Sequence, residues 1–128
     1  MDSFNVQSTS RTELIDITGL IQKHLDSKGI TDGVVTVYVP HTTAGITINE
    51  GADPAVKSDI LKVLNHIVPW EFGYSHMEGN SPAHVKTSLV GPSVQIIVEK
   101  GRLMLGTWQR VFFCEFDGPR TRKVWIKD

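Results

Sequence analysis

Two segments of the sequence place side chains capable of chemistry along one side of a predicted β-strand. Within residues 39–49, counting by twos from the histidine puts five small or polar residues on one face and leaves an apolar face for a core: His41, Thr43, Gly45, Thr47 and Asn49. Within residues 83–89, the same count puts His84, Lys86 and Ser88 on one side. If these two faces meet, they form a functional site.

Three histidines are candidate metal ligands: His41, His76 and His84. Neutral imidazoles bind Zn²⁺ and similar ions, and three histidines with one open position are typical of a catalytic metal site. No two of them have the spacing of neighbouring ligands, so such a site depends on the fold. The alternative is that they are structural or solvated histidines. That alternative suits His24 and His66, which are better explained by packing and helix-end electrostatics.

The same faces carry groups that suit a phosphate. Lys86 shares the predicted face of His84 and can neutralise a phosphate as a point charge. The hydroxyl groups of Thr43, Thr47 and Ser88 can donate hydrogen bonds to the same anion. The alternative is that these residues form the solvated face of an antiparallel sheet, which is common.

Further polar candidates come from the last third of the sequence. Residues 109–116 are a predicted strand in which Gln109 and Glu115 stand beside apolar bulk. Buried polar groups need partners, so each is a candidate to contact a substrate or to support a site, or else to make a hydrogen bond at the end of the sheet. Arg120 and Arg122 lie in or next to the following turn and can bind a phosphate, although a solvated turn or a subunit contact is the simpler explanation.

Hydrophobic periodicity predicts two amphipathic helices. The first begins near Thr18 and ends at Gly29, where a left-handed conformation can close it. The second begins where Asp53 can cap the helix and Pro54 occupies the first helical position, and it ends at Val68-Pro69. Its apolar residues recur with helical spacing and predict a buried stripe: Val56, Ile60, Val63, Leu64 and Ile67.

Most of the remaining chain has the pattern of β-strands, rich in β-branched residues and bounded by glycine and proline turns. The predicted strands are residues 4–9, 34–39, 83–90, 93–99, 102–106, 109–116 and 122–127, in addition to the strand that follows Pro40. Residues 70–82 show neither the helical nor the strand periodicity of apolar residues, which predicts a long loop. The sequence therefore predicts a single α+β domain, residues 1–128, with a mainly antiparallel β-sheet or sandwich and two helices.

The composition excludes several classes of function. The formal net charge of −1 gives no general attraction to nucleic acid or to an anionic membrane. The single cysteine, Cys114, allows no intrachain disulfide and suits a reducing compartment. The sequence shows no signal peptide and no apolar run of about 20 residues that could span a membrane. We expect a cytoplasmic protein.

Several of these stretches together resemble the YjbQ-like family, whose members are often labelled secondary thiamine-phosphate synthases. The resemblance extends along nearly the whole chain. The matching stretches are residues 39–50, 52–54, 83–86, 88–89, 101–109 and 115–120.

The resemblance implies a β-rich α+β subunit that assembles as a homotrimer. It also implies an activity that joins hydroxymethylpyrimidine diphosphate to thiazole phosphate and releases diphosphate, commonly with a divalent metal such as zinc or magnesium. The implied site residues are His41, His84, Lys86, Glu115, Asn49, Glu50, Asp53 and Gln109, with His76 matching less securely. Two alternatives stay open: a metal-dependent hydrolase of a phosphorylated small molecule, and a non-catalytic trimeric module that binds a metal or an anion.

Overall fold

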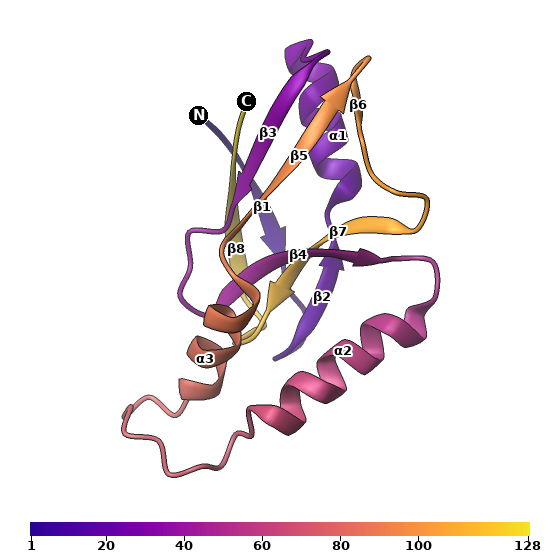
Figure 1. The fold of residues 1–128 in the computed structure, drawn as a ribbon. Coiled ribbons are helices and arrows are strands. Elements are labelled where there is room, and N and C mark those ends of the chain that lie inside the picture. The colour runs from indigo at the N-terminus through magenta and orange to yellow at the C-terminus, as the bar shows by residue number, and fades with distance from the viewer.

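The computed structural model describes residues 1–128 as two antiparallel β-sheets with three α-helices (Figure 1). The first sheet has the strand order β1 (Asp2–Gln7), β8 (Thr121–Lys127), β3 (Gly33–Tyr38), β5 (Ser93–Glu99) and β6 (Arg102–Leu103). The second sheet has the order β2 (Glu13–Asp16), β7 (Gln109–Glu115) and β4 (Ala44–Glu50). The helices are α1 (Thr18–Lys28), α2 (Pro54–Ile67) and α3 (Ser81–Val90). The predicted α+β class is confirmed.

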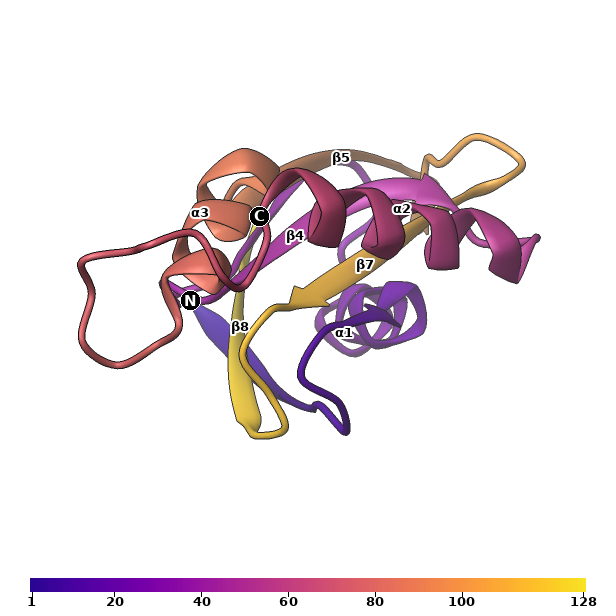
Figure 2. The same cartoon turned by 90° about the horizontal axis from the view of Figure 1, so that it is seen from below.

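Strand β7 is the centre of the second sheet and is covered on both faces. Successive side chains of a strand point to opposite sides, and here both sides are apolar. Val111 and Phe113 enter the larger hydrophobic cluster, whereas Phe112 and Cys114 enter the smaller one. Figure 2 shows α1 and α2 on opposite sides of this strand. The second sheet is therefore the middle layer of the molecule.

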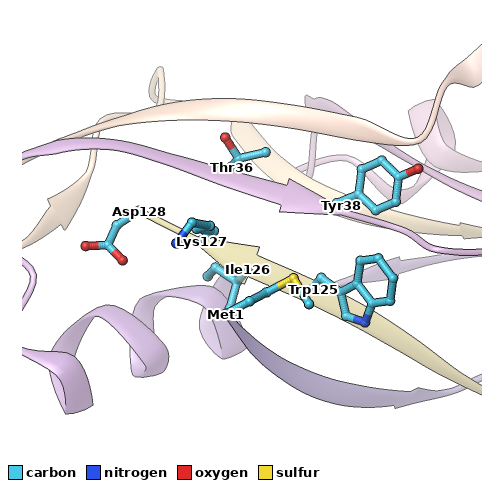
Figure 3. A pocket seen from close by; sticks show the side chains of 7 residues that line it. All are labelled: Met1, Thr36, Tyr38, Trp125, Ile126, Lys127 and Asp128. Carbon is cyan, nitrogen blue, oxygen red and sulfur yellow. The ribbon is translucent and has the colours of Figure 1, made fainter.

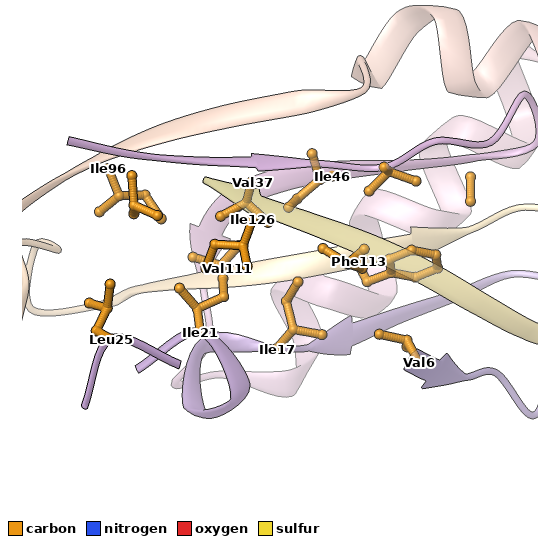
Figure 4. Packing of buried hydrophobic residues seen from close by; sticks show 14 of the residues in the cluster. Val6, Ile17, Ile21, Leu25, Val37, Ile46, Ile96, Val111, Phe113 and Ile126 are labelled. Atoms are coloured by element: carbon orange, nitrogen blue, oxygen red, sulfur yellow. The ribbon is translucent and has the colours of Figure 1, made fainter. Parts of the chain in front are cut away.

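The larger core lies between the two sheets and α1 (Figure 4). Helix α1 contributes Ile21 and Leu25 from one face of the helix, as the helical spacing predicted. The facing strands contribute alternate residues from both sheets: Val35, Val37, Ile46, Ile96, Val98, Val111, Phe113, Val124 and Ile126. Gly29, with φ of 65°, ends α1 in the predicted left-handed conformation.

Helix α2 begins as predicted but is less buried than its sequence suggested. The Asp53 carboxylate accepts a hydrogen bond from the Ala55 amide at 2.9 Å and caps the helix. No residue of α2 is fully buried, and Val63 and Ile67 are 55% and 58% exposed. Ile60 contacts the smaller core only from its edge. The predicted buried stripe is therefore only partly buried at Val56, Ile60 and Leu64, and is wrong for Val63 and Ile67.

The predicted strand at residues 83–90 is also wrong, because this segment is helix α3. Its β-branched residues favoured a strand, but Pro82 in the first turn and Gly91 after the last residue bound a helix. Positions two apart on a helix point about 200° apart around the axis, so His84 and Lys86 cannot share a face. His84 is half-buried at the surface and Lys86 is fully buried.

Other predicted elements are confirmed with small changes at their ends. Lys100 and Gly101 form the tight hairpin between β5 and β6, both with positive φ. The predicted strand at 102–106 stops at Leu103, and β2 had no clear signal in the sequence. None of the three helices is long and apolar enough to cross a membrane.

Gly45 lets β4 approach the end of α3, and this contact generates a prediction. A Cβ atom at Gly45 would lie 2.7 Å from the Gly91 carbonyl oxygen and 3.3 Å from a methyl group of Val90. Gly45→Ala should lower the free energy of unfolding by about 1–3 kcal/mol, because β4 and α3 must separate. Gly19→Ala is the control, since its Cβ would meet nothing within 4 Å. Chemical denaturation of both variants measures their free energies of unfolding. An equal change in the two variants would contradict the close approach of β4 to α3.

Candidate functional site

The start of β4, the start of α3 and the turn after β7 enclose a polar pocket of about 290 Å³. No hydrophobic residue lines it. We call it the histidine pocket, and its lining residues are Thr42, Thr43, His76, Glu78, Asn80, His84, Asp117 and Arg120. Three segments that are distant in the sequence therefore supply one site.

Two of the three predicted histidines meet in this pocket. The rings of His76 and His84 pack edge to face, with centroids 5.2 Å apart and planes at 85°. His84 projects from the first turns of α3, and His76 lies in the loop that precedes this helix. The Glu78 carboxylate lies 3.9 Å from Nε2 of His76. The pair can bind or exchange protons with a ligand in the pocket.

Asn80 and Arg120 meet at one carboxylate in the pocket wall. Asp117 accepts hydrogen bonds from the Asn80 side-chain amide at 2.9 Å and from the Arg120 guanidinium at 3.1 Å. The Oδ1 atom of Asn80 is buried and has no hydrogen-bond partner. A buried acceptor without a partner is unfavourable, so a ligand with an N–H or O–H group at this position would satisfy it.

A buried ion pair lies beneath the pocket and holds two of its walls. Glu115 is 0% exposed and Arg122 is 3% exposed, and the Arg122 guanidinium donates to both carboxylate oxygens. Arg122 also donates to the Thr43 hydroxyl at 2.9 Å, while Glu115 accepts from the Asp117 amide at 3.0 Å. The Ser8 hydroxyl donates to Glu115 at 2.7 Å.

These contacts control the ionisation of Glu115. Burial disfavours its charged form, but the hydrogen bonds from Arg122, the Asp117 amide and Ser8 outweigh burial. They hold the pKa of this carboxyl below its ordinary value. Glu115 is therefore a charged support under the pocket and has no exposed surface with which to touch a ligand.

His41 lies next to the pocket but does not line it. Its Nε2 atom accepts a hydrogen bond from the Lys123 amide at 2.9 Å, so the ring proton is on Nδ1. Burial, and then the positive charge of Arg122, lower the pKa of His41. Both effects favour the neutral ring that accepts this bond, and the acceptor lone pair is already in use.

The predicted metal centre of His41, His76 and His84 is therefore wrong. No group of three or more histidine, cysteine, aspartate or glutamate side chains is arranged to hold a metal ion. A three-histidine zinc site needs three free nitrogen lone pairs directed at one point, and the Nε2 lone pair of His41 faces a backbone amide instead.

Lys86 is held inside the molecule and does not line the histidine pocket. Its ammonium group donates to the Asn65 side chain and lies 5.2 Å from the centre of the Trp70 ring. Burial, and then the charge of Arg11, lower the pKa of Lys86. Ser88 is exposed on the outer side of α3, where its hydroxyl donates to the His84 carbonyl.

Three other predicted residues lie at the far end of the second sheet. Glu50 pairs with Gln109 in the β4–β7 register, whereas Ala44 pairs with Glu115 at the histidine-pocket end. Six residues of strand separate the two ends by about 20 Å. Asn49 and Glu50 there accept hydrogen bonds from the Glu50 and Asp53 amides, before the start of α2. The structure does not bring this group to the histidine pocket.

Of the predicted site residues, Thr43, His76, His84 and Arg120 line the pocket. Four further lining residues were not predicted from the sequence: Thr42, Glu78, Asn80 and Asp117. One signal was present for Asn80. The sequence Asn80-Ser81-Pro82 has a capping residue type followed by proline, as at the start of α2, and would have placed a helix start here.

Comparison with known proteins places the chain in a family. A family model described as UPF0047 protein YjbQ-like matches residues 2–127. The chain belongs to this family. It is 54% identical to the UPF0047 protein YugU of Bacillus subtilis over 99% of this chain and 97% of that protein. It is 51% identical to a UPF0047 protein of Methanocaldococcus jannaschii, over 97% of this chain and 90% of that protein.

Solved structures of YjbQ-like proteins have the same fold. A crystal structure from Clostridium acetobutylicum, described as an uncharacterized conserved protein of the yjbq/upf0047 family, superposes with a TM-score of 0.96 at 52% identity. It covers 99% of this chain and 98% of its own. A hypothetical protein from Aeropyrum pernix gives a TM-score of 0.93 at 38% identity, over 98% of this chain and 95% of its own.

The expected thiamine-phosphate synthase activity is wrong. The family model, the two sequence relatives and the Clostridium acetobutylicum structure are described as UPF0047 or YjbQ-like proteins, and the Aeropyrum pernix structure as a hypothetical protein. None of these descriptions carries that reaction. The histidine metal centre on which the reaction was to depend is not formed. The metal-dependent hydrolase and the metal-binding form of the trimeric module require the same centre, so these expectations are wrong as well.

The buried ion pair under the pocket generates a pH-dependent prediction. Glu115→Gln should lower the free energy of unfolding at pH 7 by about 3 kcal/mol, because Arg122 is left buried without its counter-charge. An unfolded glutamate has a pKa of about 4.3, and that of folded Glu115 is lower. The stabilisation is therefore complete above about pH 4.3 and is lost as the pH falls through the folded pKa.

Urea denaturation from pH 3 to pH 7 measures the difference between the wild type and Glu115→Gln. Glu13→Gln is the control, because the Glu13 carboxylate accepts exposed hydrogen bonds from the Thr9 amide and hydroxyl and pairs with no buried arginine. A Glu115→Gln effect that is as large at pH 3 as at pH 7 would show that the charge of Glu115 does not stabilise the fold.

Proposed function

We propose that the histidine pocket binds a small phosphorylated molecule. The observation that carries this proposal is one pocket that combines a guanidinium, two imidazoles and a helix start with a buried, unpaired amide oxygen. Each of these features is matched by one part of such a ligand. The proposal assigns binding and does not name a reaction.

The phosphate would lie against Arg120, His84 and the start of α3. A guanidinium and imidazole N–H groups are hydrogen-bond donors, and charge-assisted bonds of this kind are stronger than neutral ones. The start of a helix adds partial positive charge and favours an anion. Two carboxylates also line the pocket: Asp117 accepts hydrogen bonds from Arg120 and Asn80, and Glu78 lies 3.9 Å from Nε2 of His76. The N–H groups of Arg120 that do not bond Asp117, together with the His84 ring and the start of α3, are the donors left for an anion.

The rest of the ligand would lie near Asn80. Its unpaired Oδ1 atom selects a ligand that carries a hydroxyl or an amine in addition to the phosphate. The volume of about 290 Å³ is at the lower end of the range of about 300–1,000 Å³ for ligand pockets, which restricts the ligand to small molecules. The wholly polar lining disfavours an apolar ring system.

A substitution at His84 tests this binding. His84→Asn should raise the dissociation constant of a small phosphate ester such as glycerol phosphate at least about tenfold, since it removes a hydrogen bond to a charged group. Two-dimensional NMR of the Asn80 side-chain amide follows binding at this pocket alone. His66→Asn, at the end of α2 and outside the pocket lining, should leave the affinity unchanged.

Two outcomes would remove the proposal. The first is an Asn80 signal that does not move with inorganic phosphate or with any phosphate ester of a panel. The second is equal affinity in the wild type and in His84→Asn, with both proteins shown to be folded by their spectra.

We also propose that copies of the chain assemble as a homotrimer in the cytoplasm. What supports assembly is the outer face of the first sheet, which no helix covers. The stacked rings of Tyr38 and Trp125, 5.7 Å apart, lie beside a largely apolar pocket of about 480 Å³ (Figure 3). Val34 and Ile97 on the same face are 49% and 57% exposed. Exposed apolar areas of this kind often mark an interface.

The single cysteine suits the cytoplasm.

Light scattering after size-exclusion chromatography tests the assembly. The wild-type protein should have three times the mass of one chain, 14.2 kDa. Trp125→Ser should shift the mass toward that of a monomer, because it removes an aromatic contact from the proposed interface. Trp108→Ser is the control, since Trp108 is 64% exposed and lies outside this face. A monomeric wild type would contradict the trimer, and an unchanged Trp125→Ser trimer would contradict this interface.

A further inference from the structure

A second polar pocket lies at the opposite end of β7 from the histidine pocket. It has a volume of about 410 Å³ and lies between the start of α1 and the connection from β6 to β7. We call it the arginine pocket, and its lining residues are Thr18, Gly19, Gln22, Arg102, Leu103, Leu105, Gly106, Thr107, Gln109 and Arg110. It takes in much of the stretch at residues 101–109, to which the proposed function assigns no role.

The lining carries positive charge without a carboxylate of its own. Arg102 and Arg110 both line the pocket, and no aspartate or glutamate does. Arg110 is paired through Nε with Asp16 at 2.7 Å, which leaves its two terminal nitrogens unengaged. Arg102 makes no ion pair. Arg102 is therefore the uncompensated charge of the lining, while Arg110 keeps free N–H donors although Asp16 balances its charge.

The amide side chains of the lining use their acceptors within the protein. The Gln109 side-chain oxygen accepts from the Gly106 amide at 2.8 Å, and that of Gln22 accepts from the Leu103 amide at 3.2 Å. The Gln109 side-chain nitrogen remains free to donate. Together with the two guanidinium groups, this makes a donor-rich and acceptor-poor surface, which suits an anion with several oxygen atoms.

The pocket is also held in place before any ligand binds. Gln22 on α1 donates to the Gly101 carbonyl at 2.7 Å and so fastens the β5–β6 hairpin to the helix. The Gly51 amide donates to the Trp108 carbonyl at 2.9 Å and fixes the other side of the connection. A preformed arrangement of donors lowers the entropic cost of binding.

We propose that the arginine pocket is a second anion site, which takes the phosphoryl group of a small molecule independently of the histidine pocket. The two pockets are separated by the length of β7, about 20 Å, so one small ligand cannot occupy both. The guanidinium groups of Arg102 and Arg110 would donate hydrogen bonds to the phosphoryl oxygens. The side-chain amide of Gln109 would donate a further hydrogen bond to the same group. This site does not depend on the proposed function of the histidine pocket.

Two-dimensional NMR with inorganic phosphate at constant ionic strength tests the second site. The backbone amide signals of Gly19 and Gly106 should move in a saturable way with phosphate, because both residues line only this pocket. Arg102→Gln should weaken that response at least about tenfold. This variant should fold normally because Arg102 is exposed and unpaired, and its spectrum verifies that directly.

Arg120→Gln is the matched control, since it removes an exposed arginine from the histidine pocket instead. It should leave the Gly19 and Gly106 response unchanged. The site is overturned if these signals do not move with phosphate, if sodium chloride at equal ionic strength moves them equally, or if Arg102→Gln responds like the wild type. Failure of binding at Asn80 with a retained response at Gly19 would remove the proposed function and leave this site standing.

Discussion

The buried pair of Glu115 and Arg122 is the interaction on which the histidine pocket depends. Removing two charges from water is costly, and this cost is offset here because every oxygen of Glu115 is hydrogen-bonded. The same groups reach Thr43 in one wall and the Asp117 amide in another. The pair thus joins the stability of the core to the shape of the site.

Strand β7 relates the two pockets to the layers of the fold. Its interior residues are apolar on both faces and hold the middle sheet between α1 and α2. Polar residues occur only at the two ends of the strand, Gln109 and Arg110 at one end and Glu115 at the other. Each end therefore meets a different set of loops and helix starts. Two separate polar pockets therefore lie at the two ends of one buried strand.

The sequence predicted the fold class because its signals are local. The Asp53-Pro54 helix start, the Gly29 helix end and the alternation within residues 109–116 each depend on a few neighbouring residues, and the structure confirms them. The segment at 83–90 failed because β-branched residues suit a strand and are also tolerated in a short buried helix. That one error placed His84 and Lys86 on the same face.

The sequence by itself determined the family, the α+β class and four residues of the histidine pocket: Thr43, His76, His84 and Arg120. Only the tertiary structure decided that His41 faces a backbone amide, that Lys86 lies in the core, and that Asn80 and Asp117 complete the pocket. The physical reason is the distance along the chain over which each kind of interaction acts. Helix and strand signals are set by neighbours in the chain, whereas a site is set by packing between segments up to about a hundred residues apart.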